Sequence, residues 1–122
     1  MSVETTEKET WNRAFERYSA KDYDAARTEA GKLTASTAYR NPAHLLSGAA
    51  YLEQNRPQEA LREFSQVDRA ALSLYQKAQF NIALAYIRAR DAQAAKSQLQ
   101  KIAKDPENRY GGKAEEILKA LK

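Results

Sequence analysis

The chain has 122 residues, of which 43% are hydrophobic, with four glycines, three prolines and no cysteine. This size and composition predict one folded domain with a hydrophobic core, and they exclude disulfide bonds and cysteine chemistry. The formal net charge is +4, and the whole excess lies in residues 88–122, which hold nine lysines and arginines against five acids. A basic end can attract an acidic partner, although a solvated surface is the simpler interpretation.

The sequence contains no run of about 18 apolar residues of the kind that spans a bilayer. Its first 20 residues lack the basic start and apolar stretch of a signal peptide. We therefore expect a soluble domain, with a flexible N-terminus over residues 1–5 and a single domain over residues 6–122.

Apolar residues at helical spacing, together with helix start signals, predict seven helices. The first begins at a capping box that runs from Thr6 to Glu9, and the second begins after the N-cap residue Asp22. The third is expected to begin at Asn41-Pro42, with Asn41 as the N-cap and Pro42 in the first helical position.

The remaining helix boundaries are marked by prolines and an aspartate. Pro57 is expected to open the fourth helix, and the fifth extends over about residues 73–89. Asp91 is the expected N-cap of the sixth helix, which ends at Pro106. A short seventh helix within residues 110–122 is expected to cap the array with a polar outer face.

Small residues recur along the chain with a period of 34–35 residues, at two positions that lie twelve residues apart in each repeat. Where two helices cross closely, glycine or alanine lets the backbones approach without forcing a side chain out of its rotamer. The period therefore predicts three helix hairpins, over residues 7–40, 41–74 and 75–109. The small residues are Ala14 and Ala26, Gly48 and Ala60, and Ala83 and Ala95.

These positions resemble the tetratricopeptide repeat (TPR) family. The family pattern has a tyrosine three residues after the first small residue and a large apolar residue four after the second. The second repeat matches this pattern with Tyr51 and Phe64, and the third matches it with Tyr86 and Leu99. The first repeat departs from it, with Arg17 at the tyrosine position and an alanine at the large apolar one.

The resemblance implies an all-α fold: three TPR hairpins stacked in a right-handed α-solenoid, plus a C-terminal capping helix. Lys21, Asn55 and Arg90 replace the usual turn glycine, and asparagine tolerates the left-handed backbone conformation best. The C-terminal half is also similar to TPR domains of bacterial cell-envelope proteins. This implies a periplasmic or membrane-tethered location, and the cytoplasm is the alternative.

Groups that could perform catalysis or bind metal are few. His44 is the single histidine, and no partner for it is evident from the spacing. Ser19, Ser47 and Ser73 lie in no motif that would activate a nucleophile. The glycine pair at 111–112 is the start of a helix rather than a phosphate-binding loop. We therefore expect no enzyme, no cofactor and no metal site.

The resemblance implies that the first helix of each hairpin lines a concave, largely apolar groove that holds a peptide or helix of a partner protein. Some relatives grip a C-terminal carboxylate, but Trp11, Phe15 and Leu46 stand where those need lysine and asparagine. Three alternatives stay open: Trp11 and Phe15 belong to the core, the N-terminal tail covers them, or the face mediates self-association into a homo-oligomer. The implied groove residues are Trp11, Phe15, Tyr18, Leu45, Ala49, Leu52, Lys77, Phe80, Asn81, Leu84, Ile87 and Arg88.

Two functions of different classes follow from these observations. The first is a non-catalytic protein-interaction scaffold. The alternative is binding of a polyanion, either nucleic acid or an anionic membrane surface, through the basic C-terminal third. Nucleic acid is disfavoured because single-strand binding needs exposed aromatic rings among the cations, and only Tyr110 lies near them. We expect Tyr39, Tyr75 and Tyr110 to act as wedges between hairpins.

Overall fold

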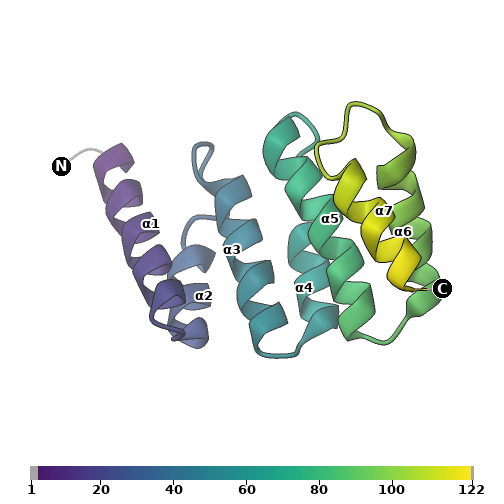
Figure 1. The fold of residues 1–122 in the computed structure, drawn as a ribbon. Coiled ribbons are helices and arrows are strands. Elements are labelled where there is room, and N and C mark those ends of the chain that lie inside the picture. Colours follow the sequence, from purple (N-terminus) through teal and green to yellow (C-terminus); the bar gives the residue numbers. More distant parts are fainter. Residues whose placement is uncertain (1–2, 122) are drawn as a thin grey trace.

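The computed structural model describes residues 3–121, which form seven helices and no strand (Figure 1). The expected all-α fold class is therefore confirmed for this range. The helices are α1 (Val3–Ser19), α2 (Tyr23–Gly31), α3 (Arg40–Glu53), α4 (Pro57–Phe64), α5 (Leu72–Arg88), α6 (Ala92–Lys104) and α7 (Gly111–Ala120).

Each helix packs against the next one along the chain, and successive helices run in opposite directions (Figure 1). The two ends of the chain lie at opposite ends of the resulting array. Contacts between helices that are not consecutive join α1 to α3 and α3 to α5. These three helices therefore form one continuous side of the molecule.

The turn that ends each of α1, α3 and α5 has the same geometry. Lys21, Asn55 and Arg90 have positive φ angles of 64°, 57° and 62°. In each turn the following residue donates its backbone N–H to a carbonyl five residues back, as in the bond of 2.8 Å from Arg56 to Tyr51. This pattern is the Schellman motif, which satisfies the last carbonyls of a helix and reverses the chain. Three non-glycine residues thus occupy a conformation that glycine adopts most easily.

Helix starts after these turns agree with the sequence prediction. The Asp22 and Asp91 side chains accept hydrogen bonds from the backbone N–H groups of Ala25 and Ala94, at 3.3 and 3.1 Å. Both aspartates are therefore N-caps, as predicted. Pro57 is the first residue of α4, where its missing N–H costs no helical hydrogen bond.

Two predicted helix starts differ from the structure. Helix α1 begins at Val3 instead of Thr6, so residues 3–5, which we expected to be flexible, are helical, while residues 1 and 2 lie outside the described range. No proline or glycine occurs among residues 3–5 to stop the helix. Thr6 lies inside α1, where its backbone carbonyl accepts the Thr10 hydroxyl at 3.0 Å.

Helix α3 begins at Arg40, and its N-cap is Tyr39, so the prediction of Asn41 as N-cap is wrong. The Asn41 side chain instead accepts the backbone N–H of Asp68 at 3.0 Å and thereby ties α3 to the loop between α4 and α5. Pro42 still lies in the first turn of the helix, where backbone N–H groups have no intrahelical partner.

The repeated small residues are buried where the two helices of each pair pack together. Ala14, Ala26, Ala60, Ala83 and Ala95 are completely buried. At Gly48 in α3, an added Cβ atom would lie 2.4 Å from Cε1 of Phe64, a fully buried ring on α4. The absence of a side chain at Gly48 is therefore required for α4 to pack this closely on α3.

Aromatic rings pack between successive hairpins, as expected for Tyr39 and Tyr110. Tyr39 stacks on Trp11 of α1 with ring centroids 6.1 Å apart, and Tyr110 stacks on Phe80 of α5 at 4.9 Å. Tyr75 packs against the central core cluster, which contains the fully buried Phe64. Tyr39 and Tyr110 directly precede α3 and α7, whereas Tyr75 lies in the first turn of α5 and therefore does not precede its helix.

Among residues 3–121, no helix combines the length and apolar character needed to cross a lipid bilayer.

The contact between Gly48 and Phe64 predicts that Gly48→Ala lowers the free energy of unfolding by about 1–2 kcal/mol, because overpacking outweighs the better helix propensity of alanine. Gly31→Ala is the matched control, since nothing lies within 4 Å of an added Cβ there. We expect the control to be neutral or to stabilise by up to about 1 kcal/mol. Urea unfolding followed by circular dichroism measures both, and equal effects would contradict the crossing argument.

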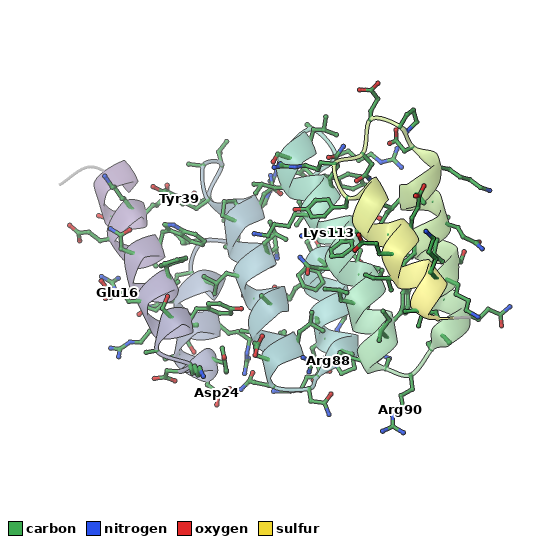
Figure 2. The ribbon with its side chains drawn as sticks, viewed as in Figure 1. Glu16, Asp24, Tyr39, Arg88, Arg90 and Lys113 are labelled. Carbon is green, nitrogen blue, oxygen red and sulfur yellow. The ribbon has the colours of Figure 1, made fainter. Side chains whose placement is uncertain are left out.

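The left-handed turns predict that Arg90→Gly stabilises the fold by about 1 kcal/mol, because glycine removes the steric cost of positive φ. Arg90 extends into solvent from the turn after α5 and makes no described hydrogen bond through its side chain (Figure 2). Lys101→Gly, at an exposed position inside α6, should instead destabilise by about 1 kcal/mol. Thermal unfolding of the two variants checks this prediction: the melting temperature should rise for Arg90→Gly and fall for Lys101→Gly.

Candidate groove on the face of α1, α3 and α5

Three hollows adjoin one another on the side formed by α1, α3 and α5, and we call them together the groove. The first, about 380 Å³, lies over α1 beside Trp11. The second, about 300 Å³, lies between all three helices and shares Phe15 with the first. The third, about 370 Å³, extends to Arg88 at the end of α5 and shares Tyr18, Ala49 and Asn81 with the second.

Eleven of the twelve residues that the sequence analysis placed in a groove line these hollows. The exception is Phe80, whose ring stacks on Tyr110 and packs against the C-terminal core cluster, which contains the buried Leu99 and Ile102. Four lining residues were not among the predicted groove residues: Asn12, Glu16, Leu46 and Glu53. Glu16 directly follows Phe15, and Glu53 directly follows Leu52. Both glutamates therefore lie beside predicted groove residues, at the polar edge of the same helix face.

Phe15 is the most exposed aromatic side chain in the groove. It is 56% exposed, although its ring contacts Trp11 at a centroid distance of 6.5 Å. Trp11 is half-buried and packs against the N-terminal core cluster, which contains the buried Ala14, Leu33 and Leu46. The alternative that both rings belong to the core therefore describes Trp11 in part but does not describe Phe15.

Tyr18 lies where the second and third hollows meet, and its hydroxyl is held in the neutral form. Its pKa is raised above the usual value, first by burial, then by the nearby negative charge of Glu53 and by Tyr23. The rings of Tyr18 and Tyr23 meet edge to face, with centroids 5.5 Å apart. Tyr18 thus offers a protonated hydroxyl at the place where the second and third hollows meet.

Polar groups on one side of the groove come from α5. Lys77 and Asn81 are one helical turn apart, and within the described part of the chain neither side chain has a hydrogen-bond or ion-pair partner. Arg88 lies at the C-terminal end of α5 (Figure 2) and donates to the backbone carbonyl of Leu52 at 3.1 Å. Lys77 and Asn81 therefore keep their donors available to a ligand.

A polar hollow of about 270 Å³ lies away from the groove and is lined by residues of α2, α3 and α4, including Arg27, Tyr51 and Glu63. His44 Nδ1 lies 3.2 Å from a Glu63 carboxylate oxygen, so the single histidine does have a partner, contrary to the sequence analysis. The partner lies 19 residues away on the next helix, a separation for which the sequence contains no signal. The pair joins α3 to α4.

The basic C-terminal third contains no described ion pair: all six pairs among the described residues lie between Arg13 and Asp68. Arg109 instead donates to the Ser73 hydroxyl and lies near the Tyr110 ring. Lys101, Lys104, Lys113 and Lys119 of α6 and α7 are exposed, and no described acid lies within ion-pair distance of them.

Among the described side chains, those of residues 6–121, no group of three or more histidine or acidic residues is arranged to hold a metal ion. A comparison of the chain with protein-family models and with curated protein sequences gives no match.

The exposure of Phe15 predicts that Phe15→Ser changes the free energy of unfolding by no more than about 0.5 kcal/mol, as for other surface positions. Trp11→Ser should cost about 2 kcal/mol, because it removes a ring that is stacked and half-buried. Urea unfolding of both variants measures the difference. A cost for Phe15→Ser as large as that for Trp11→Ser would place Phe15 in the core.

Proposed function

We propose that the chain is a TPR-type α-solenoid that serves as a non-catalytic scaffold and holds a peptide or helix of a partner protein in the groove. The observation that carries this proposal is the continuous surface of three adjoining hollows around the exposed Phe15 ring. Apolar surface of this kind, bordered by polar groups, is typical of protein-interaction sites.

The repeat assignment is supported by features that recur in register. The three left-handed turns after α1, α3 and α5 share one hydrogen-bond pattern, and the small residue at each hairpin crossing is buried. Tyrosine wedges precede α3 and α7 and pack in the same manner on the hairpin before them. Stacked units of one geometry are the defining property of a solenoid.

A second candidate function is binding of a polyanion through the C-terminal third. It is favoured by the uncompensated lysines and arginines of α6, α7 and the adjoining loop. Such binding depends on the release of counterions from the polyanion.

The first function predicts that peptides selected from a displayed random library bind in the groove. Phe15→Glu and Leu84→Glu, which place a charge on its apolar floor, should weaken such binding at least tenfold, or by about 1.4 kcal/mol. Leu72→Glu is the matched control, because among the described side chains Leu72 is the other large exposed apolar residue, at 62%, and it lines none of the three hollows.

Fluorescence titration with labelled peptides gives the dissociation constants, and circular dichroism verifies that each variant is folded. Binding that is insensitive to both groove variants, or equally sensitive to Leu72→Glu, would contradict the proposal. A light-scattering measurement of mass in wild type and Leu84→Glu distinguishes self-association, since a dimer through this face would dissociate in the variant.

The second function predicts binding of a single-stranded DNA oligonucleotide or of anionic phospholipid vesicles that weakens steeply as salt rises from about 0.05 to 0.5 M. Replacing Lys101 and Lys104 by glutamine should reduce both the affinity and the salt dependence. Peptide binding in the groove should change little over the same range of salt, so one titration separates the two functions.

A further inference from the structure

We propose that the polar hollow between α2, α3 and α4 is a binding site for a small zwitterion, a molecule of amino-acid size with an ammonium group and a carboxylate. The hollow lies away from the groove, so this inference goes beyond the proposed function and does not depend on it. Two observations carry it: a buried hydroxyl that has no protein partner, and two opposite charges that line the same hollow without pairing.

The buried hydroxyl belongs to Ser47 of α3. This residue is 6% exposed, and its side chain makes no hydrogen bond to any described residue. No described polar side-chain atom is both fully buried and unpartnered, so the Ser47 oxygen reaches the hollow that the residue lines. Burying a hydroxyl without a hydrogen bond costs free energy, and a ligand in the hollow can supply that bond.

The repeat period indicates that the fold does not need a hydroxyl at this place. Ser47 directly precedes Gly48, and Ile82 directly precedes Ala83 at the corresponding place in the next hairpin. Ile82 is 8% exposed and belongs to the central core cluster. Because an apolar side chain satisfies this position in one hairpin, we assign the serine in the other to binding.

The positive charge in the hollow comes from Arg27 of α2, whose side chain is 18% exposed. Its guanidinium donates to the side chains of Gln54 and Tyr51, at 3.2 Å each, and to the Asp24 carboxylate. These bonds fix its orientation and leave further N–H groups without a described partner. Asp24 is 79% exposed, so solvent screens its charge, and Arg27 can still donate to a ligand carboxylate.

The negative charge comes from Glu63 of α4, whose side chain is 26% exposed. Its Oε1 lies 3.2 Å from His44 Nδ1, and its Oε2 has no described partner. Arg27 and Glu63 line the same hollow, yet each has a different ion-pair partner. A simple anion would meet Glu63 and a simple cation would meet Arg27, whereas a zwitterion complements both charges.

The dimensions of the hollow agree with a small ligand. Its volume of about 270 Å³ is just below the range of about 300–1,000 Å³ that is typical of sites for drug-sized molecules. Gly31, the last residue of α2, also lines the hollow, and an added Cβ there would meet no atom within 4 Å. A side chain at position 31 therefore has room to extend into the hollow.

The test titrates the full chain, near neutral pH, with three zwitterions of increasing charge separation: glycine, γ-aminobutyrate and ε-aminocaproate. Calorimetry gives the affinity, and we expect at least one of them to bind with a dissociation constant of about 1 mM or lower. The N-acetyl and the amide derivatives of that compound each lack one charge, and they should bind about tenfold more weakly. No binding by any of the three, or equal binding by either derivative, overturns the inference.

Ser47→Ala separates a binding role from a structural one. The hydroxyl has no protein partner, so the melting temperature should stay unchanged or rise, while the affinity for the zwitterion should fall about fivefold. A lower melting temperature with unchanged affinity would assign the hydroxyl to the fold and overturn the inference. Ser97→Ala is the matched control, because Ser97 is an exposed serine on α6 that does not line the hollow, and it should change neither quantity.

Two further variants locate the ligand. Glu63→Gln removes the negative charge but keeps an acceptor for His44, and it should weaken binding about tenfold. Gly31→Leu should abolish binding because its side chain fills the hollow, whereas Phe15→Glu in the groove should leave it unchanged. A zwitterion that binds equally well to Glu63→Gln and Gly31→Leu occupies another place, and this overturns the inference while the groove function remains.

Discussion

The close approach of α3 and α4 is the constraint on which the rest of the structure depends. The Phe64 ring occupies the space that a side chain at Gly48 would fill, and alanines occupy the corresponding position in the two other hairpins. The second helix of each hairpin packs against the first helix of the same hairpin. The first helices α1, α3 and α5 then contact one another and leave one side uncovered. The proposed groove is a consequence of this packing.

The turns determine which residues line that side. Each first helix ends in a Schellman motif, so the chain reverses at the same point relative to the small residue in every hairpin. Side chains spaced by three and four residues on α1, α3 and α5 are therefore brought into register across the groove. The Tyr39 and Tyr110 rings, which stack on the preceding first helix, support the spacing between hairpins.

Sequence reasoning was most successful for features that depend on near neighbours in the chain. The N-caps Asp22 and Asp91, the helix start at Pro57 and the buried alanines all follow from local chemistry or from the repeat period. It was less successful for contacts between distant residues. Asn41 is a residue type that often caps helices, but its side chain accepts a hydrogen bond from the backbone of Asp68 in a later loop. His44 has its partner, Glu63, on the next helix. Phe80 has the spacing of a groove residue, yet Tyr110 of the following segment covers it.

The prevalence of contacts between consecutive helices has a consequence for how the chain acquires its structure. Only a short loop joins α1 to α2, and these two helices make their contacts with each other and with α3. Short loops lose little entropy on closure, and proteins rich in sequence-local contacts fold rapidly. On the ribosome, the first hairpin has all of its internal partners as soon as Gly31 has emerged from the exit tunnel. The core around α1 and α2 is completed by Ala43 and Leu46 of α3, so each segment that follows along the chain supplies the next part of the interface.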